Sequence, residues 1–195
     1  MLEKLVLYLD ILTIFFTDNH LKNLDLQFKM KIVKVKNETI KLLIWDIPSE
    51  KLYDTSSKNL YKGSRGIIFI YDVTDQNSFK NIVNLINKVE SNMNFVYTKV
   101  LVGNKCDKSE RVVTEEEGKK LAEENNMHYF ETSAKTDQNI IEVFKYLSDE
   151  MYNIALSGDR YKRINPQTEP NKKEKKNCFH QKVYIYIIFN LNLSL

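Results

Sequence analysis

The chain has 195 residues, of which 43% are hydrophobic and 28% charged. This composition is typical of a globular protein with one well-buried core, and it argues against disorder of the whole chain. The 29 Lys and Arg residues are nearly balanced by 26 Asp and Glu residues, so we expect no nucleic-acid partner. Two cysteines, Cys106 and Cys178, cannot form a disulfide framework or a four-ligand zinc site, which favours a reducing, cytoplasmic environment.

The first 27 residues form an atypical N-terminal segment. The chain has only five glycines, and the first of them is Gly63, so no Gly-rich phosphate or dinucleotide loop exists in the first sixty residues. Leu5–Leu9 fits a β-strand, but the apolar residues between Leu2 and Phe16 also recur at helical spacing. Both interpretations of this segment stay open.

After this segment, strand patterns and helix patterns alternate. Two β-rich runs, Ile32–Lys36 and Ile40–Trp45, predict a hairpin. The elements expected after the hairpin are a strand over 66–71, a helix over 79–89, a strand over 100–102, a helix over 114–125, a strand over 127–132 and a helix over 140–154. Such alternation predicts an α/β fold with a mostly parallel sheet that is flanked by helices on both faces.

Beyond Ser157 the helical pattern ends. Residues 159–177 are polar and include the basic cluster Lys172–Lys176, which predicts a flexible tail. The last stretch, Val183–Leu195, is rich in Tyr, Ile, Asn and Leu and forms an atypical apolar end. We therefore expect an N-terminal segment over 1–27, a globular domain over 28–157 and a basic tail over 158–195.

Polar motifs follow three of the predicted strands. They are Trp45-Asp46, Gly103–Asp107 (Gly-Asn-Lys-Cys-Asp) and Glu131–Lys135 (Glu-Thr-Ser-Ala-Lys). Ligands of parallel sheets bind at the carboxyl ends of the strands, where these motifs lie. A carboxylate such as that of Asp107 accepts from the two adjacent N–H donors of guanine, and adenine has no such pair. These loops are therefore where we expect a ligand.

Together these motifs resemble the guanine-nucleotide-binding domain of Ras-like small GTPases, with the Rab family as the best match. Leu60–Gly66 and Ile70–Thr74 are also Rab-like, and Phe28–Lys31 with Leu101–Asp107 faintly resembles the Rab-eighteen branch. The resemblance covers about residues 28–152 and implies a P-loop-NTPase-like G domain. It further implies a switch that binds GTP or GDP with Mg²⁺ and meets effectors and regulators in vesicle traffic, on the cytosolic face of endomembranes.

The resemblance also implies roles for particular residues. The guanine-binding set is Asn104, Lys105, Asp107, Ser133, Ala134 and Lys135. In the family the lysine stem lies along the base plane, the asparagine ties the two loops together, and the alanine N–H points at the guanine oxygen. Asp46 stands where the family has a carboxylate that reaches Mg²⁺ through water.

The chain departs from the family pattern at every phosphate-contacting position. The first strand and the Gly-x-x-x-x-Gly-Lys-Ser/Thr loop have no counterpart, and segment 1–27 resembles only a remnant of the first helix and switch I. In switch II, Ser49 replaces a glycine and Glu50 replaces the glutamine that positions water. An ionised carboxylate cannot donate a hydrogen bond and repels phosphate. We therefore expect no intact catalytic residue, a weak or absent Mg²⁺ site, and impaired phosphate binding and hydrolysis.

Two alternatives to a working switch stay open. The chain is either a non-catalytic, Rab-like interaction module (a pseudo-GTPase) or an incomplete gene-model form of a complete Rab. In the family the first strand lies in the middle of the sheet, so a replacement strand is needed, and Leu5–Leu9 is a candidate. Cys178 after the basic cluster resembles a prenylated Rab end, but it lies 17 residues before the last residue, so only peripheral membrane contact is expected.

Overall fold

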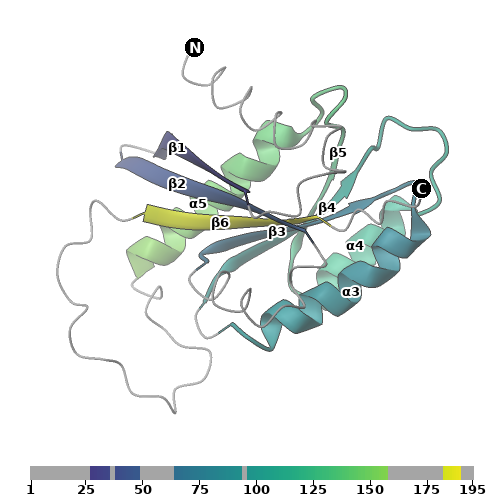
Figure 1. Ribbon diagram of the computed structural model, residues 1–195, viewed down its shortest axis with the longest axis horizontal. Coiled ribbons are helices and arrows are strands. Elements are labelled where there is room, and N and C mark those ends of the chain that lie inside the picture. The colour runs from purple at the N-terminus through teal and green to yellow at the C-terminus, as the bar shows by residue number, and fades with distance from the viewer. Residues whose placement is uncertain (1–26, 36–37, 49–63, 94–95, 158–181, 190–195) are drawn as a thin grey trace.

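The computed structural model describes residues 27–35, 38–48, 64–93, 96–157 and 182–189 (Figure 1). They form a six-stranded sheet with helices on both faces. The strands are β1 (Gln27–Val35), β2 (Glu38–Pro48), β3 (Gly66–Asp72), β4 (Thr98–Asn104), β5 (His128–Thr132) and β6 (Lys182–Phe189), and the helices are α3 (Gln76–Glu90), α4 (Glu115–Glu124) and α5 (Ile140–Ser157). The predicted α/β fold with a mostly parallel sheet is confirmed.

The strand order is β1-β2-β6-β3-β4-β5, and only the β1–β2 pair is antiparallel. The predicted hairpin is therefore present, although its strands are longer than the two β-rich runs in the sequence. The described helices include none that is long and apolar enough to cross a membrane.

The core has two layers because β3 is buried on both faces. Ile67, Phe69 and Tyr71 point to the face that α3 and α4 cover, whereas Ile68 and Ile70 point to the face that α5 covers. All seven residues of the strand are buried. A parallel strand covered on both faces has no solvent side, which explains why its sequence is an unbroken apolar run.

Helices α3 and α4 begin at side chains that cap them. The carboxylate of Asp75 accepts from the backbone N–H of Asn77 at 2.8 Å. Thr114 and Glu117 form the expected capping box, in which each side chain accepts from the backbone N–H of the other residue. These caps satisfy N–H groups that have no partner within the helix and fix where each helix leaves the edge of the sheet.

The middle of the sheet is occupied by β6. It pairs in parallel with β2 along its whole length and with β3 from Ile185 to Phe189. The structure thus differs from the expected tail over Lys182–Phe189, which belong to the sheet. The physical reason is that β2 and β3 would otherwise face each other with unpaired N–H and C=O groups, and a run of β-branched and aromatic residues supplies the ladder. The other candidate, Leu5–Leu9, lies outside the described residues.

The pairing of β6 predicts the effect of a proline at position 187. Ile187 lies opposite Asp46 in β2 and opposite Ile68 in β3. Proline removes an N–H group from the ladder, so Ile187→Pro should lower the free energy of unfolding by about 2 kcal/mol or more. Urea denaturation measures this loss. Ile187→Val, which keeps the N–H and the β-branch, should unfold close to the wild type, and equal stability of the proline variant would contradict a central β6.

Candidate functional site

The carboxyl ends of β3, β4 and β5 lie level with one another. Asp72 is opposite Asn104, and Asn104 is opposite Thr132, so the last residues of the three strands form one row. The loops that continue from Asn104 and Thr132 therefore leave the sheet side by side. This register brings together the two polar motifs that the sequence placed at strand ends.

The loop after β4 turns back toward β5 immediately. Lys105 has a φ of 66°, a left-handed conformation that is uncommon for a residue with a side chain. Two backbone hydrogen bonds hold this turn: the N–H of Cys106 donates to the carbonyl of Thr132, and the N–H of Lys108 donates to the carbonyl of Lys105, each at 3.0 Å. The strained turn places Asp107 beside the loop after β5.

Asn104 and Thr132 link the two loops at their base. Both side chains are buried, and the Thr132 hydroxyl donates to the Asn104 side-chain oxygen at 3.1 Å. A buried hydrogen bond of this kind is costly to leave unmade, so it fixes the distance between the loops. Asn104 thus links the two polar motifs through this hydrogen bond.

Lys105 makes an ion pair that sequence reasoning missed. Its ammonium nitrogen lies 2.5 Å from Oδ2 of Asp72, a carboxylate that is 8% exposed. The other oxygen of Asp72 accepts from the backbone N–H and the hydroxyl of Thr74, at 2.8 and 2.7 Å. Asp72 therefore stands as a fixed anion at the end of β3 and holds the Lys105 stem along the edge of the site. No pattern in the local sequence predicts this contact, because Asp72 ends β3 and Lys105 follows β4, far apart in the chain.

Asp107 and Ser133 meet across the two loops. The Ser133 hydroxyl donates to Oδ1 of Asp107 at 2.5 Å and accepts from the backbone N–H of Thr136 at 3.1 Å. This hydrogen bond is the main reason that the pKa of the Asp107 carboxyl is lowered. The site therefore presents an ionised, solvent-facing carboxylate at neutral pH.

The loop after β5 is closed by a small backbone bridge. Ser133 and Gln138 exchange two backbone hydrogen bonds, at 3.2 and 3.0 Å. Ala134 is buried in this bend, and Lys135 is exposed at its rim. Among the described residues, the N–H of Ala134 has no hydrogen-bond partner. The bend thus sets a backbone donor and a cation next to the Asp107 carboxylate.

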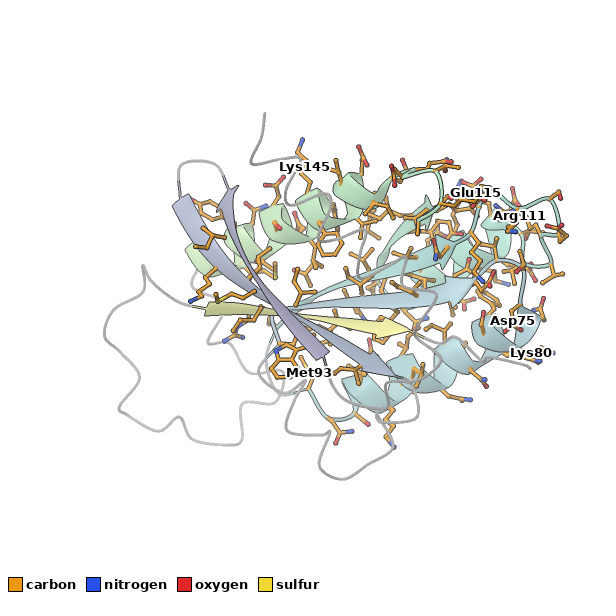
Figure 2. The ribbon with its side chains drawn as sticks, turned by 45° about the horizontal axis from the view of Figure 1, so that its top comes forward. Asp75, Lys80, Met93, Arg111, Glu115 and Lys145 are labelled. Atoms are coloured by element: carbon orange, nitrogen blue, oxygen red, sulfur yellow. The ribbon has the colours of Figure 1, made fainter. Side chains whose placement is uncertain are left out.

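A second ion pair, between Arg111 and Glu131, joins the loop after β4 to the end of β5. The guanidinium nitrogens of Arg111 lie 2.6 and 2.7 Å from the two carboxylate oxygens of Glu131. Figure 2 shows Arg111 at the same edge of the molecule as Asp75, the cap of α3. Sequence reasoning quoted Glu131 within its motif but assigned no role to either residue.

The residues expected near the phosphates and the metal are only partly described. The backbone of Asp46 lies in β2 opposite Ile187, while its side chain, Glu50 and Cys178 lie outside the described residues. Within the described ranges no three His, Cys, Asp or Glu side chains gather in a way that could hold a metal ion.

Cys106 lies within the first polar motif, where its surroundings disfavour the thiolate form. Burial raises the pKa of its thiol, and the neighbouring carboxylates of Glu131 and Asp107 raise it further. A thiol whose pKa is raised stays protonated at neutral pH and is therefore inert. Its side chain acts as a small filler in the loop.

Known proteins resemble this chain over most of its length. The Ras family matches residues 4–153 of the chain. Ras-related protein Rab-13 from Bos taurus is 34% identical over 165 residues, which cover 83% of this chain and 81% of that protein. Ras-related protein RABE1e from Arabidopsis thaliana is 38% identical over 146 residues, covering 74% and 67%. Ras-related protein Rab-1 from Theileria parva is 40% identical over 131 residues, covering 66% and 60%.

The Ser133 hydrogen bond predicts how Asp107 titrates. A lowered pKa means that the bond contributes fully above the ordinary carboxyl pKa of about 3.9 and is lost as the pH falls through the lowered value. Ser133→Ala should therefore raise the pKa of Asp107 toward its ordinary value, which carbon-13 NMR of the carboxyl group measures. Ser109→Ala, a matched change at an exposed position of the same loop, should leave this pKa alone. An unchanged pKa in Ser133→Ala would refute the assignment.

Proposed function

The chain belongs to the Ras family of small GTPases and is Rab-like, and we propose that it binds guanine nucleotides chiefly through the base. The observation that carries the proposal is the meeting of the Asp107 carboxylate with the Ser133–Lys135 bend at the level ends of β4 and β5. In the proposed complex, the two N–H donors on one edge of guanine donate to the two oxygens of Asp107. The N–H of Ala134 donates to the guanine oxygen, and the Lys105 stem covers the base.

Selectivity for guanine follows from this arrangement. Adenine presents an acceptor where guanine presents its ring N–H, so an ionised carboxylate meets a lone pair there. A site that is built to pair polar groups rejects a ligand that leaves them unpaired. Ser133 holds one oxygen of Asp107 and keeps the carboxylate charged, which supports an orientation fixed before the base arrives.

The phosphates are held weakly in this proposal. The resemblance places the phosphate loop after the central strand, and in this chain the central strand is β6. The sequence after Phe189 reads Asn-Leu-Asn-Leu-Ser-Leu, with neither glycine nor lysine. Loss of about four charge-assisted contacts of about 1.5–3 kcal/mol each removes roughly 6–12 kcal/mol, or more than about ten-thousandfold in affinity. Base recognition alone then gives micromolar binding or weaker.

Hydrolysis of GTP is impaired for a related reason. Phosphoryl transfer depends on cations and backbone donors that stabilise charge on the transferred group. The sequence offers Glu50 where the family positions water with glutamine, and the described residues offer no metal site. We infer that Mg²⁺ contributes little to nucleotide binding by this chain.

The Rab names of the relatives support a role in vesicle traffic, through effectors and regulators at the cytosolic face of endomembranes. The basic cluster Lys172–Lys176 and Cys178 support peripheral membrane contact only.

One observation supports the pseudo-GTPase alternative: β6 fills the central position of the sheet, and the six residues after it include no glycine and no lysine. A folded, Rab-like surface that binds partners without a nucleotide cycle is therefore the second candidate function. An incomplete gene-model form of a complete Rab is the third interpretation.

Calorimetric titration of the full chain with guanosine, GDP and GTP, with and without Mg²⁺, tests the proposal. We expect the dissociation constants of guanosine and GDP to agree within about tenfold, or about 1.4 kcal/mol, because phosphates add little. Mg²⁺ should change neither value, and adenosine should not bind. GDP binding a thousandfold tighter than guanosine, with a requirement for Mg²⁺, would refute weak phosphate binding. Failure of every guanine ligand to bind would refute base recognition.

A further inference from the structure

We propose that the Arg111–Glu131 ion pair is the positioning element of the guanine site. The pair fixes the loop that carries Asp107 relative to the bend that carries Ser133, and so sets how well the site distinguishes guanine from bases that lack its amino group. This inference rests on the proposed guanine binding. Neither residue touches the base in this account, so both act through Asp107.

The geometry of the pair is that of a fork. Nη1 of Arg111 donates to Oε1 of Glu131 at 2.6 Å, and Nη2 donates to Oε2 at 2.7 Å. Nη1 also donates to the carbonyl of Val113 at 3.1 Å. The side chains are 28% exposed for Arg111 and 15% exposed for Glu131. A bidentate, partly buried contact fixes orientation as well as distance, which a lysine could not do in its place.

Glu131 is itself held by the core. The Tyr129 hydroxyl donates to Oε1 of Glu131 at 3.0 Å. The hydroxyl oxygens of Tyr129 and Tyr71 lie 2.9 Å apart. These two tyrosines pack against Gly118 of α4, where an added Cβ would lie 2.5 Å from either hydroxyl oxygen. Burial raises the pKa of Tyr71 to about 12, so its hydroxyl keeps its proton. The Glu131 carboxylate is therefore held in place by packed residues of β3, β5 and α4.

Arg111 connects the loop after β4 to this fixed carboxylate. The loop from Lys105 to Val113 is fixed at its far end, where the N–H groups of Val112 and Val113 donate to the carbonyl of Val73 at 2.9 and 3.0 Å. Its start is fixed by the N–H of Cys106, which donates to the carbonyl of Thr132 at 3.0 Å. In the described part of the chain, only two polar side-chain contacts join the stretch between these ends to β5 and the bend that follows it. They are the Asp107–Ser133 hydrogen bond and the Arg111–Glu131 fork.

An ordinary surface ion pair would not have this effect, and the chain offers one for comparison. Lys119 and Glu115 on α4 make a single contact at 2.7 Å with side chains that are 55% and 49% exposed. Pairs of that kind contribute little, because solvent screens them and flexible side chains lose entropy. The fork differs in its burial, its two parallel bonds and its support by Tyr129.

The expected consequence is a loss of selectivity. Two parallel hydrogen bonds from guanine to Asp107 tolerate little displacement of the carboxylate, and inosine, which lacks the amino group, uses only one of them. A loop released from Glu131 should therefore lose guanosine affinity more than inosine affinity. A merely structural role would lower the affinity for both nucleosides equally.

The test compares guanosine and inosine binding by the full chain, the variant Arg111→Met and the control Lys119→Met. In Arg111→Met the guanosine dissociation constant should rise about tenfold and the inosine constant should change less than threefold, since the second hydrogen bond to the charged group is lost. Arg111→Lys should lie between the wild type and Arg111→Met, because it keeps the charge without the fork. Lys119→Met, which removes the exposed pair, should match the wild type.

The outcomes separate this inference from the proposed function. If the wild type binds guanosine and Arg111→Met keeps the wild-type guanosine-to-inosine ratio, the positioning role is wrong. If the wild type binds neither nucleoside, the proposed guanine binding itself is wrong. Circular dichroism checks the folding of each variant. Should Arg111→Met fail to fold, the ratio in Arg111→Lys decides, and an unchanged ratio there overturns the inference.

Discussion

The parallel register of β3, β4 and β5 is the constraint on which the site depends. Because Asp72, Asn104 and Thr132 end their strands in one row, the loops after β4 and β5 leave the sheet side by side. The Lys105–Asp72 ion pair and the Asp107–Ser133 hydrogen bond then each join neighbouring strand ends or the loops that follow them. A shift of one residue in this register would separate these partners. The contacts of the candidate site therefore depend on how the strands pair.

The same sheet explains how the chain departs from its family without losing the fold. The position between β2 and β3 must be filled, because two inner strands with unpaired backbone groups would be costly. The structure fills it with β6, which has the apolar, β-branched composition of a central strand. In the proposed account, the base-binding half of the site lies at the ends of β4 and β5. Residues 190–195, which follow β6 in the sequence, include no glycine and no lysine.

Local patterns in the sequence predicted much of this structure. The hairpin, the buried run of β3 and the capping box of Thr114 and Glu117 each depend on residues close together in the chain, and strand ends predicted where the motifs meet. The place of β6 was missed because pairing with β2 and β3 joins segments far apart in sequence, and a polar stretch separates it from α5. The Arg111–Glu131 fork was missed for a similar reason, since its partners are 20 positions apart in sequence and neither forms a periodic pattern.

The most direct test of guanine recognition at this edge is a change of base preference in Asp107→Asn. An asparagine side chain offers one acceptor and one donor, whereas the Asp107 carboxylate offers two acceptors. We expect the variant to lose guanosine affinity by about a hundredfold, as two bonds to a charged group are replaced by one neutral bond and a clash. It should gain affinity for xanthosine, whose base presents an N–H beside a carbonyl. Guanosine binding by the variant that equals the wild type would contradict the account.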